Sequence, residues 1–261
     1  MTAEKPFDLI IVGAGLAGGL IALALKAKRP ELRVALIEAG KRAGGNHLWS
    51  CFPGDVSPQD RWLIEPLIVH SWGGHEVRFP DHARVLGEGY ASLTSERLDS
   101  HLRRTLGSEA LMLDRPVRGL TPTSVTLEDG TVLQAQGVID ARGPGDMSAL
   151  DLGWQKFLGL GWLCDAPHGL TRPIIMDATV DQSEGYRFVY VLPLSARELF
   201  IEDTYYTGGP ELDVPALTAR IAGYAAAQGW EGKAAGHQET GVLAVCMGGD
   251  IDRLWRAEAP G

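Results

Sequence analysis

The sequence predicts an α/β fold in which a Rossmann-like nucleotide-binding module is interlocked with a mostly antiparallel sheet. Near the N-terminus, a glycine-rich turn lies between a short β-branched run and a run rich in Ala and Leu, which indicates the βαβ module. After it, short strand-like apolar runs dominate the chain, which indicates the sheet. The length of 261 residues suits one large domain or two closely associated ones.

The first elements of the chain follow from their composition. Residues 7–12 form a short apolar run typical of a buried strand. Residues 16–28 are rich in Leu and Ala and therefore predict a helix. A second strand is expected over residues 33–38, which end in an acidic side chain.

The turn between the first strand and the helix has the spacing GxGxxG, formed by Gly13, Gly15 and Gly18. In this pattern the first glycine permits a tight turn, the second lets the backbone approach a pyrophosphate, and the third lets the helix pack closely on the strands. The free N–H groups at the helix N-terminus bind phosphates. Glu38, about 20 residues after Gly18, stands where an acid accepts hydrogen bonds from ribose hydroxyls. The pattern predicts a dinucleotide site and suits FAD and NAD equally.

Charge and composition argue against several classes of protein. A net charge of −9 and the lack of a basic run longer than Arg103-Arg104 argue against a nucleic-acid partner. The three cysteines are far apart and lack CxxC spacing, so neither a disulfide framework nor a metal site is expected. No signal peptide is recognisable, and the strand–turn–helix pattern explains the uncharged run 9–25 better than a membrane span does. We expect a cytoplasmic protein whose membrane contact would be peripheral.

Local patterns predict the remaining elements. Residues 41–55 are rich in Gly, Asn, His and Trp and predict a loop, either a surface connection or a segment laid against the cofactor. Hairpins are expected about Gly73-Gly74 and Asp129-Gly130. Helices are expected over 94–107, and over 213–229 with Asp213 as N-cap. Further strands are expected within 138–143, 173–180, 186–194 and 199–206.

Several of these segments together resemble the bacterial lycopene β-cyclases. The resemblance runs from residue 7 to about residue 240 and rests on the GxGxxG with Glu38 and on six further segments. These are GGNHLW at 44–49, VRFP at 77–80, VIDARG at 138–143, PIIMDATVDQ at 173–182, GYRFVYVLPLS at 185–195 and IEDTYY at 201–206. The resemblance implies a flavoprotein fold of the aromatic-hydroxylase type, with an FAD-binding domain and a sheet domain that roofs a lipophilic cavity.

The same resemblance implies an activity in carotenoid biosynthesis. It implies that the linear ψ ends of lycopene are closed into β rings with reduced FAD and without net oxidation, NAD(P)H being a candidate reductant of the flavin. The carotenoid is then the lipophilic partner, and no metal is implied. Gly143, with Asp140 and Arg142, matches the second flavin segment of the family, and Asn46 and His47 match a flavin-side loop. Purely structural roles stay open for His47, Asp140 and Arg142.

The resemblance also divides the chain. We expect an FAD-binding domain over residues 1–160, with the hairpin 66–80 joining the substrate sheet, and a substrate-binding sheet domain over 161–261. Members of this family continue with a glycine-rich segment that closes over the flavin, and then with a helical part. We therefore expect this chain to correspond to the first two thirds of a cyclase, and the activity of this length of chain stays an open question.

Glu202 and Asp203, in the segment RELFIEDTYY, are the candidate catalytic carboxylates. Protonating an unactivated alkene requires an acid that is neutral near neutral pH, and apolar surroundings produce one by penalising the charged form. Side chains alternate between the two faces of a strand, so the two carboxylates are expected to point to opposite faces. The resemblance identifies Glu202 as the acid that faces the substrate. Asp203 is then structural or faces solvent.

Two other functions stay open. An FAD-dependent oxidoreductase or monooxygenase acting on a lipophilic substrate would consume NAD(P)H or oxygen in proportion to its product, whereas a cyclase would not. A non-catalytic module that binds a carotenoid or a partner would lack the spectrum of a bound flavin.

Overall fold

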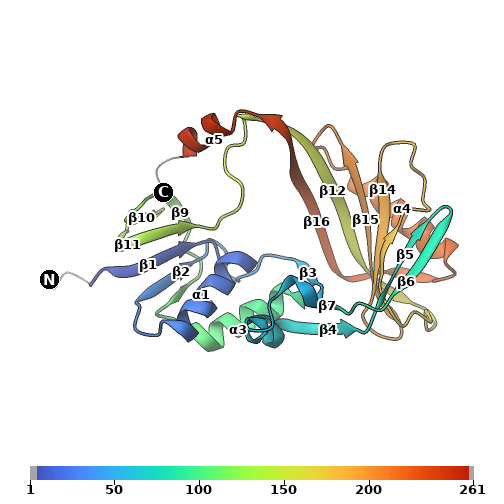
Figure 1. The fold of residues 1–261 in the computed structure, drawn as a ribbon, viewed down its shortest axis with the longest axis horizontal. Helices are drawn as coiled ribbons and strands as arrows, with labels where there is room; N and C mark the ends of the chain where they lie inside the picture. The colour runs from blue at the N-terminus through green and yellow to red at the C-terminus, as the bar shows by residue number, and fades with distance from the viewer. Residues whose placement is uncertain (1–4, 259–261) are drawn as a thin grey trace.

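A computed structural model describes residues 5–258 of the chain. Figure 1 shows two large sheets at opposite ends of the molecule, with a small sheet below and between them. The six-stranded sheet has the order β8 (Leu111–Met112), β2 (Val34–Ile37), β1 (Phe7–Val12), β11 (Val132–Asp140), β10 (Ser124–Leu127) and β9 (Val117–Thr121). Its first four strands are parallel, as expected for a βαβ module, and the last three form an antiparallel meander.

Two helices cover one face of the six-stranded sheet. They are α1 (Leu16–Lys28) and α3 (Ser95–Leu106), and their leucines pack with Ile11 and Leu36 of the central strands. On the other face Ile10 and Ile37 pack against the meander. The strand predicted over 7–12, the helix predicted over 16–28 and the hairpin predicted about Asp129-Gly130 are confirmed.

The helix ends follow from local capping. The Thr94 hydroxyl accepts a hydrogen bond from the Arg97 backbone at the start of α3, and Gly107, with φ of +73°, ends it. At the start of α4 (Val214–Ala227) the Asp213 carboxylate accepts one from the Ala216 backbone. Both predicted helices are therefore confirmed, including the predicted N-cap.

The seven-stranded sheet lies at the other end of the molecule (Figure 1). Its order is β16 (Gly232–Gly249), β12 (Leu150–Cys164), β15 (Glu198–Thr207), β14 (Arg187–Pro193), β13 (Ile174–Asp177), β5 (His75–Phe79) and β6 (His82–Leu86). Neighbouring strands are antiparallel except β13 and β5. Helix α4 covers one face, where Leu217 and Ile221 pack on Leu158 and Ile201. The strands predicted between residues 173 and 206 are confirmed, whereas β12 and β16 were not predicted.

The small sheet has the order β3 (Leu48–Cys51), β7 (Tyr90–Thr94) and β4 (Ile68–Trp72). The hairpin predicted about Gly73-Gly74 is wrong, because β4 pairs with β7 whereas β5 pairs with β6 and β13. The glycine pair links two sheets: a Cβ on Gly74 would lie 2.6 Å from the Leu86 carbonyl oxygen, so glycine is needed for a close backbone approach. The loop predicted over 41–55 contains β3.

Short helices complete the described residues. These are η1 (Pro53–Asp55), α2 (Arg61–Ile64), η2 (Glu65–Leu67) and α5 (Ile251–Glu258). No helix within residues 5–258 is both long and apolar enough to span a membrane. The expected division at residue 160 falls inside β12, which belongs entirely to the seven-stranded sheet.

Candidate functional site

A cavity of about 390 Å³ lies at the carboxyl ends of the parallel strands β1, β2 and β11. This is the edge at which open α/β sheets bind ligands. The lining includes five of the residues singled out in the sequence, namely Gly13, Gly15, Glu38, His47 and Arg142. Residues far apart in the chain are thus brought together around one space at the N-terminus of α1.

The three glycines of the GxGxxG turn occupy different environments. Gly13 has φ of +104°, and a Cβ there would lie 2.5 Å from the Ala141 carbonyl oxygen. A Cβ on Gly18 would lie 2.0 Å from the Gly13 carbonyl oxygen, which explains the close approach of α1 to the turn. At Gly15, by contrast, a Cβ would meet nothing within 4 Å. The backbone at Gly15 is therefore open to a ligand in the cavity.

Two charged groups are held at the rim of this cavity. The Glu38 carboxylate accepts hydrogen bonds from the backbone N–H groups of Ala14 and Gly40, both at 2.9 Å. The Arg142 guanidinium donates from Nε to Asp140 Oδ1 at 2.8 Å and from Nη2 to Asp140 Oδ2 at 2.6 Å. These hydrogen bonds hold the pKa of Asp140 below its usual range. Asp140 thereby orients Arg142 at the cavity.

Four of the nine candidate cofactor-binding residues lie outside the lining of the cavity, namely Gly18, Asn46, Asp140 and Gly143. Gly18 packs beneath the turn, and Gly143 follows Arg142 with φ of +101°. The Asn46 side chain donates a hydrogen bond to the Gln238 carbonyl of β16 at 2.7 Å. The segment 44–49 thus contacts both the cavity and the seven-stranded sheet.

Strand pairing places the Glu202 side chain in a row across the seven-stranded sheet. Tyr190 of β14, Glu202 of β15, Gly159 of β12 and Glu239 of β16 are paired side by side. The row faces the small sheet, because the Tyr190 hydroxyl lies 2.9 Å from Ser50 Oγ. This face is opposite to the one that α4 covers.

Glu202 lies in surroundings that favour its neutral form. Burial, reinforced by the negative charges of Glu239 and Asp203, raises the pKa of Glu202 to about 7. The hydrogen bond that it accepts from the Thr204 hydroxyl at 2.7 Å opposes this shift only in part. Glu202 is therefore a carboxyl group that is substantially protonated at neutral pH.

Asp203 points to the other face of the sheet, as the strand period predicts. Its side chain is completely buried beside α4, and it accepts a hydrogen bond from Arg187 Nε at 2.9 Å. The interpretation that Asp203 faces solvent is wrong, because this ion pair holds it inside. The alternative that it supports the strand fits the observed contacts.

Glu239 and His237 belong to the same face as Glu202, and neither was singled out in the sequence. Glu239 is buried, and its Oε2 accepts hydrogen bonds from the Leu48 backbone and from His237 Nε2, both at 2.7 Å. The hydrogen bond to Glu239 raises the pKa of His237. The alternation of His237 and Glu239 is a period-two signal that becomes informative only once β16 is known to be a strand.

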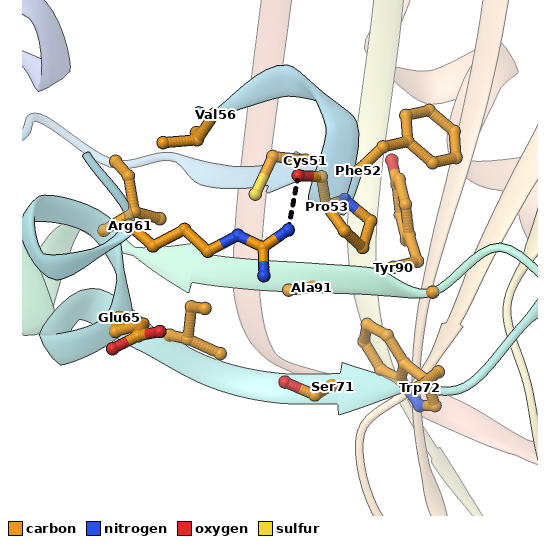
Figure 2. A pocket seen from close by; sticks show the side chains of 13 residues that line it. Cys51, Phe52, Pro53, Val56, Arg61, Glu65, Ser71, Trp72, Tyr90 and Ala91 are labelled. Atoms are coloured by element: carbon orange, nitrogen blue, oxygen red, sulfur yellow. Dashed lines mark hydrogen bonds between the residues drawn. The ribbon is translucent and has the colours of Figure 1, made fainter. Parts of the chain in front are cut away.

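A second cavity, of about 250 Å³, lies on the opposite face of the small sheet. Figure 2 shows Cys51 and Ala91 facing it, while the Arg61 side chain extends across it to the Pro53 carbonyl. Ser50 and Ser92 are adjacent to Cys51 and Ala91 in their strands, so they point the other way, toward Tyr190. The small sheet therefore lies between this cavity and Glu202, and Tyr90 contacts both the cavity and Tyr190.

Comparison with known proteins identifies the family. The family model described as lycopene cyclase protein matches residues 8–260. The chain belongs to the lycopene cyclase family. It is 49% identical over 254 residues to the lycopene beta-cyclase of Pseudescherichia vulneris, and 47% identical over 254 residues to that of Pantoea ananas. These matches cover 97% of the chain but only 65% and 66% of the relatives, so the chain spans about two thirds of their length.

The fold of this lycopene cyclase family member is that of flavin-dependent oxygenases and halogenases. The halogenase Xcc4156 from Xanthomonas campestris superposes with a TM-score of 0.63 at 14% identity, covering 92% of this chain and 62% of that one. The 2-methyl-3-hydroxypyridine-5-carboxylic acid oxygenase superposes with a TM-score of 0.61 at 16% identity, covering 94% of this chain and 74% of that one. The predicted fold of the aromatic-hydroxylase type is confirmed.

Proposed function

We propose that this chain carries the cofactor-binding and acid-bearing parts of a lycopene β-cyclase, which closes the ψ ends of lycopene into β rings. The observation that carries the proposal is Glu202, a carboxyl group whose pKa is raised to about 7 on the sheet face directed toward segment 44–49. An alkene is protonated only by an acid that still holds its proton, and burial provides one here. Membership of the family supplies the substrate class.

FAD is the cofactor that we propose for the cavity beside α1. The open backbone at Gly15 and the N-terminus of α1 suit a pyrophosphate, and the anchored Glu38 suits a ribose. His47 and Arg142 also line the space, with Gly18, Asp140 and Gly143 supporting its wall and Asn46 tying segment 44–49 to β16. Reduced FAD, once bound, supplies an electron-rich group that stabilises a nearby cation. NAD(P)H is the reductant that we propose for it.

The two large sheets then correspond to two functional parts. We propose that the six-stranded sheet is the core of an FAD-binding domain and that the seven-stranded sheet is the substrate-binding part, with residues 75–86 joining the latter. Segment 44–49 connects them through the Asn46 hydrogen bond to Gln238 and the Leu48 hydrogen bond to Glu239.

The residues on this face support a sequence of proton and bond changes. Glu202 gives its proton to the terminal double bond of the ψ end, so a tertiary cation forms. The neighbouring double bond attacks this cation and closes the ring. The rings of Tyr90, Tyr190 and Phe200 pack together on this side of the sheet and can stabilise positive charge through their faces. Loss of a proton then sets the ring double bond, and no electrons are gained or lost overall.

The substrate also suggests where the protein works. Lycopene is a hydrocarbon that partitions into lipid, so we propose a peripheral membrane contact on the cytoplasmic side. Flotation of the protein with neutral lipid vesicles tests this contact, and recovery of all the protein in the lipid-free fraction would contradict it.

The test of the proposed function uses the chain extended to the length of its relatives. Lycopene and reduced FAD are supplied, and ring closure is scored for the parent enzyme, Glu202→Gln and the control Glu198→Gln. Glu198 is an exposed residue of the same strand. We expect ring closure by the parent and the control, and a loss of at least 100-fold in Glu202→Gln, since glutamine keeps the shape without the acidic proton. Full turnover by Glu202→Gln, or consumption of NAD(P)H or oxygen in proportion to product, would contradict the proposal.

A further inference from the structure

A second carboxylate stands on the same face as Glu202. Glu239 lies two strands away in the same row, and only Gly159, which has no side chain, separates them in the pairing. The Phe200 ring occupies the space above Gly159, since a Cβ there would lie 2.1 Å from Phe200 Cζ. Glu202 and Glu239 therefore flank an aromatic face.

The hydrogen bonds of the two carboxyl groups differ. Glu202 accepts a hydrogen bond only from the neutral Thr204 hydroxyl among the described residues, whereas Glu239 accepts one from the Leu48 backbone N–H and one from the His237 imidazole. Such donors favour the ionised form of a carboxyl group, and burial without them favours the neutral form. By these contacts Glu202 is suited to give up a proton, and Glu239 is suited to accept one.

We propose that Glu239, oriented by His237, is the base that removes the proton from the ring cation formed by Glu202. The inference rests on the proposed cyclase function. Glu239 is the catalytic residue in this step, and His237 is a positioning residue. A carboxylate that accepts two hydrogen bonds is a weak base, but a tertiary carbocation is so acidic that a weak base is sufficient.

The bonds and protons of this step balance. The O–H bond of Glu202 breaks as a C–H bond forms at the inner carbon of the terminal double bond, which leaves the positive charge on the carbon that bears two methyl groups. A C–C bond to that carbon then closes the ring. A C–H bond next to the cationic carbon breaks, its electron pair forms the ring double bond, and an O–H bond forms on Glu239. His237, whose side chain is 24% exposed, connects Glu239 to solvent, so the proton on Glu239 can leave. Glu202 itself is partly accessible, so solvent can return a proton to it. Nothing is oxidised or reduced.

The choice of proton decides the product. The cationic ring carbon has three carbon neighbours that carry hydrogen: the ring carbon attached to the polyene, the ring methylene and the methyl group. Loss of a proton from the first gives the β ring, and loss from the other two moves the double bond within the ring or outside it. A base fixed on one side of the cation selects one of these products. A residue that merely holds the fold together does not control the position of the double bond.

The experiment compares variants of the full-length enzyme with lycopene and reduced FAD, and separates ring isomers by chromatography and NMR. Glu239→Gln keeps the hydrogen-bond acceptor for Leu48 and removes the base, Glu239→Asp keeps a carboxylate, and Thr240→Ala is a control at an exposed position of the same strand. We expect Glu239→Gln to bind FAD and to form β rings about 100-fold more slowly, with isomeric rings accumulating. We expect β-ring formation to be partly restored in Glu239→Asp, unchanged in Thr240→Ala, and reduced in the same direction, but less, in His237→Gln.

The outcomes separate this inference from the proposed function. A parent enzyme that forms no rings contradicts the cyclase function itself. A parent that forms β rings, together with a Glu239→Gln enzyme of unchanged rate and product, contradicts only the role of Glu239. Loss of FAD binding and of all ring closure in both the Gln and the Asp variants assigns Glu239 to clamping segment 44–49 and overturns the proposal.

Discussion

Glu202 and Asp203 are adjacent in strand β15, but they point to opposite faces of the seven-stranded sheet and have opposite electrostatic partners. Asp203 is completely buried against the Arg187 guanidinium. Within residues 5–258, Glu202 accepts only a hydroxyl hydrogen bond, and it shares its face with the carboxyl group of Glu239. One carboxyl group is thus held in a buried ion pair, while burial raises the pKa of its neighbour in sequence to about 7.

The rate of ring closure should fall as the pH rises above 7. Burial raises the pKa of Glu202 to about 7, so its protonated fraction decreases tenfold for each further pH unit. We expect kcat/KM of the full-length enzyme to approach a plateau below pH 7 and to decline above it. The measurement is a pH series with reduced FAD held in excess, and a rate that increases between pH 7 and 9 would contradict the acid role.

Replacing Glu202 with glutamine should stabilise the fold at alkaline pH. A folded-state pKa of about 7 against a reference value of 4.5 means that the folded protein binds more protons than the unfolded chain between these values, so stability is lost as the pH rises through that range. Glutamine removes this loss, and at about 1.36 kcal/mol per pKa unit we expect a gain of about 3 kcal/mol at pH 8. Urea unfolding at pH 5 and pH 8 measures it. An equal effect of the substitution at both pH values would show that Glu202 is not neutral in the fold.

Breaking the buried pair between Arg187 and Asp203 should destabilise the protein. Arg187→Met leaves the Asp203 charge buried and uncompensated, which costs about 3 kcal/mol. Adding Asp203→Asn to it removes the orphaned charge, and we expect part of the stability to return. The control is Arg29→Met, which removes an exposed pair with Glu31 and should leave the free energy of unfolding nearly unchanged. Additive effects of Arg187→Met and Asp203→Asn would contradict a direct coupling.

The parts of the fold that the sequence predicts depend on local rules. The GxGxxG turn, the caps of α3 and α4 and the opposite faces of Glu202 and Asp203 each follow from a few neighbouring residues. Strands β12 and β16 were not predicted because they contain several glycines, which are normally depleted in strands. Here glycine makes room for aromatic rings from the neighbouring strand: a Cβ on Gly159 would collide with Phe200, and one on Gly241 with Phe157.

In the candidate site, too, local sequence patterns identify only some of the residues. Glu38 and the glycines could be found because their spacing reflects one ligand, and Glu202 because its segment resembles a family motif. Glu239 stands 37 positions after Glu202 (239 − 202), and the pairing of each with Gly159 is what places them in one row. That pairing depends on tertiary contacts that no local pattern encodes. The contact between Tyr90 and Tyr190 cannot be predicted from local sequence either, because their hydroxyl groups meet across two different sheets.

Enlarging Gly15 should weaken flavin binding without disturbing the fold. A Cβ at Gly15 meets nothing within 4 Å and its backbone faces the cavity, so only a ligand would be displaced by a methyl group. We expect Gly15→Ala in the full-length protein to raise the Kd for FAD at least tenfold, about 1.4 kcal/mol, with an unchanged Tm of the flavin-free protein. Flavin fluorescence titration and thermal unfolding measure the two quantities.

Two further glycines make this prediction specific. Gly119→Ala also adds a methyl group in open space, but Gly119, on β9, is not part of the cavity lining, so neither FAD affinity nor Tm should change. Gly13→Ala places a Cβ 2.5 Å from the Ala141 carbonyl oxygen at a φ of +104°, so it should lower the Tm as well as FAD affinity. If Gly15→Ala lowered the Tm as Gly13→Ala does, Gly15 would be required for the fold and not for the ligand. If it bound FAD as tightly as the parent, the pyrophosphate would lie elsewhere.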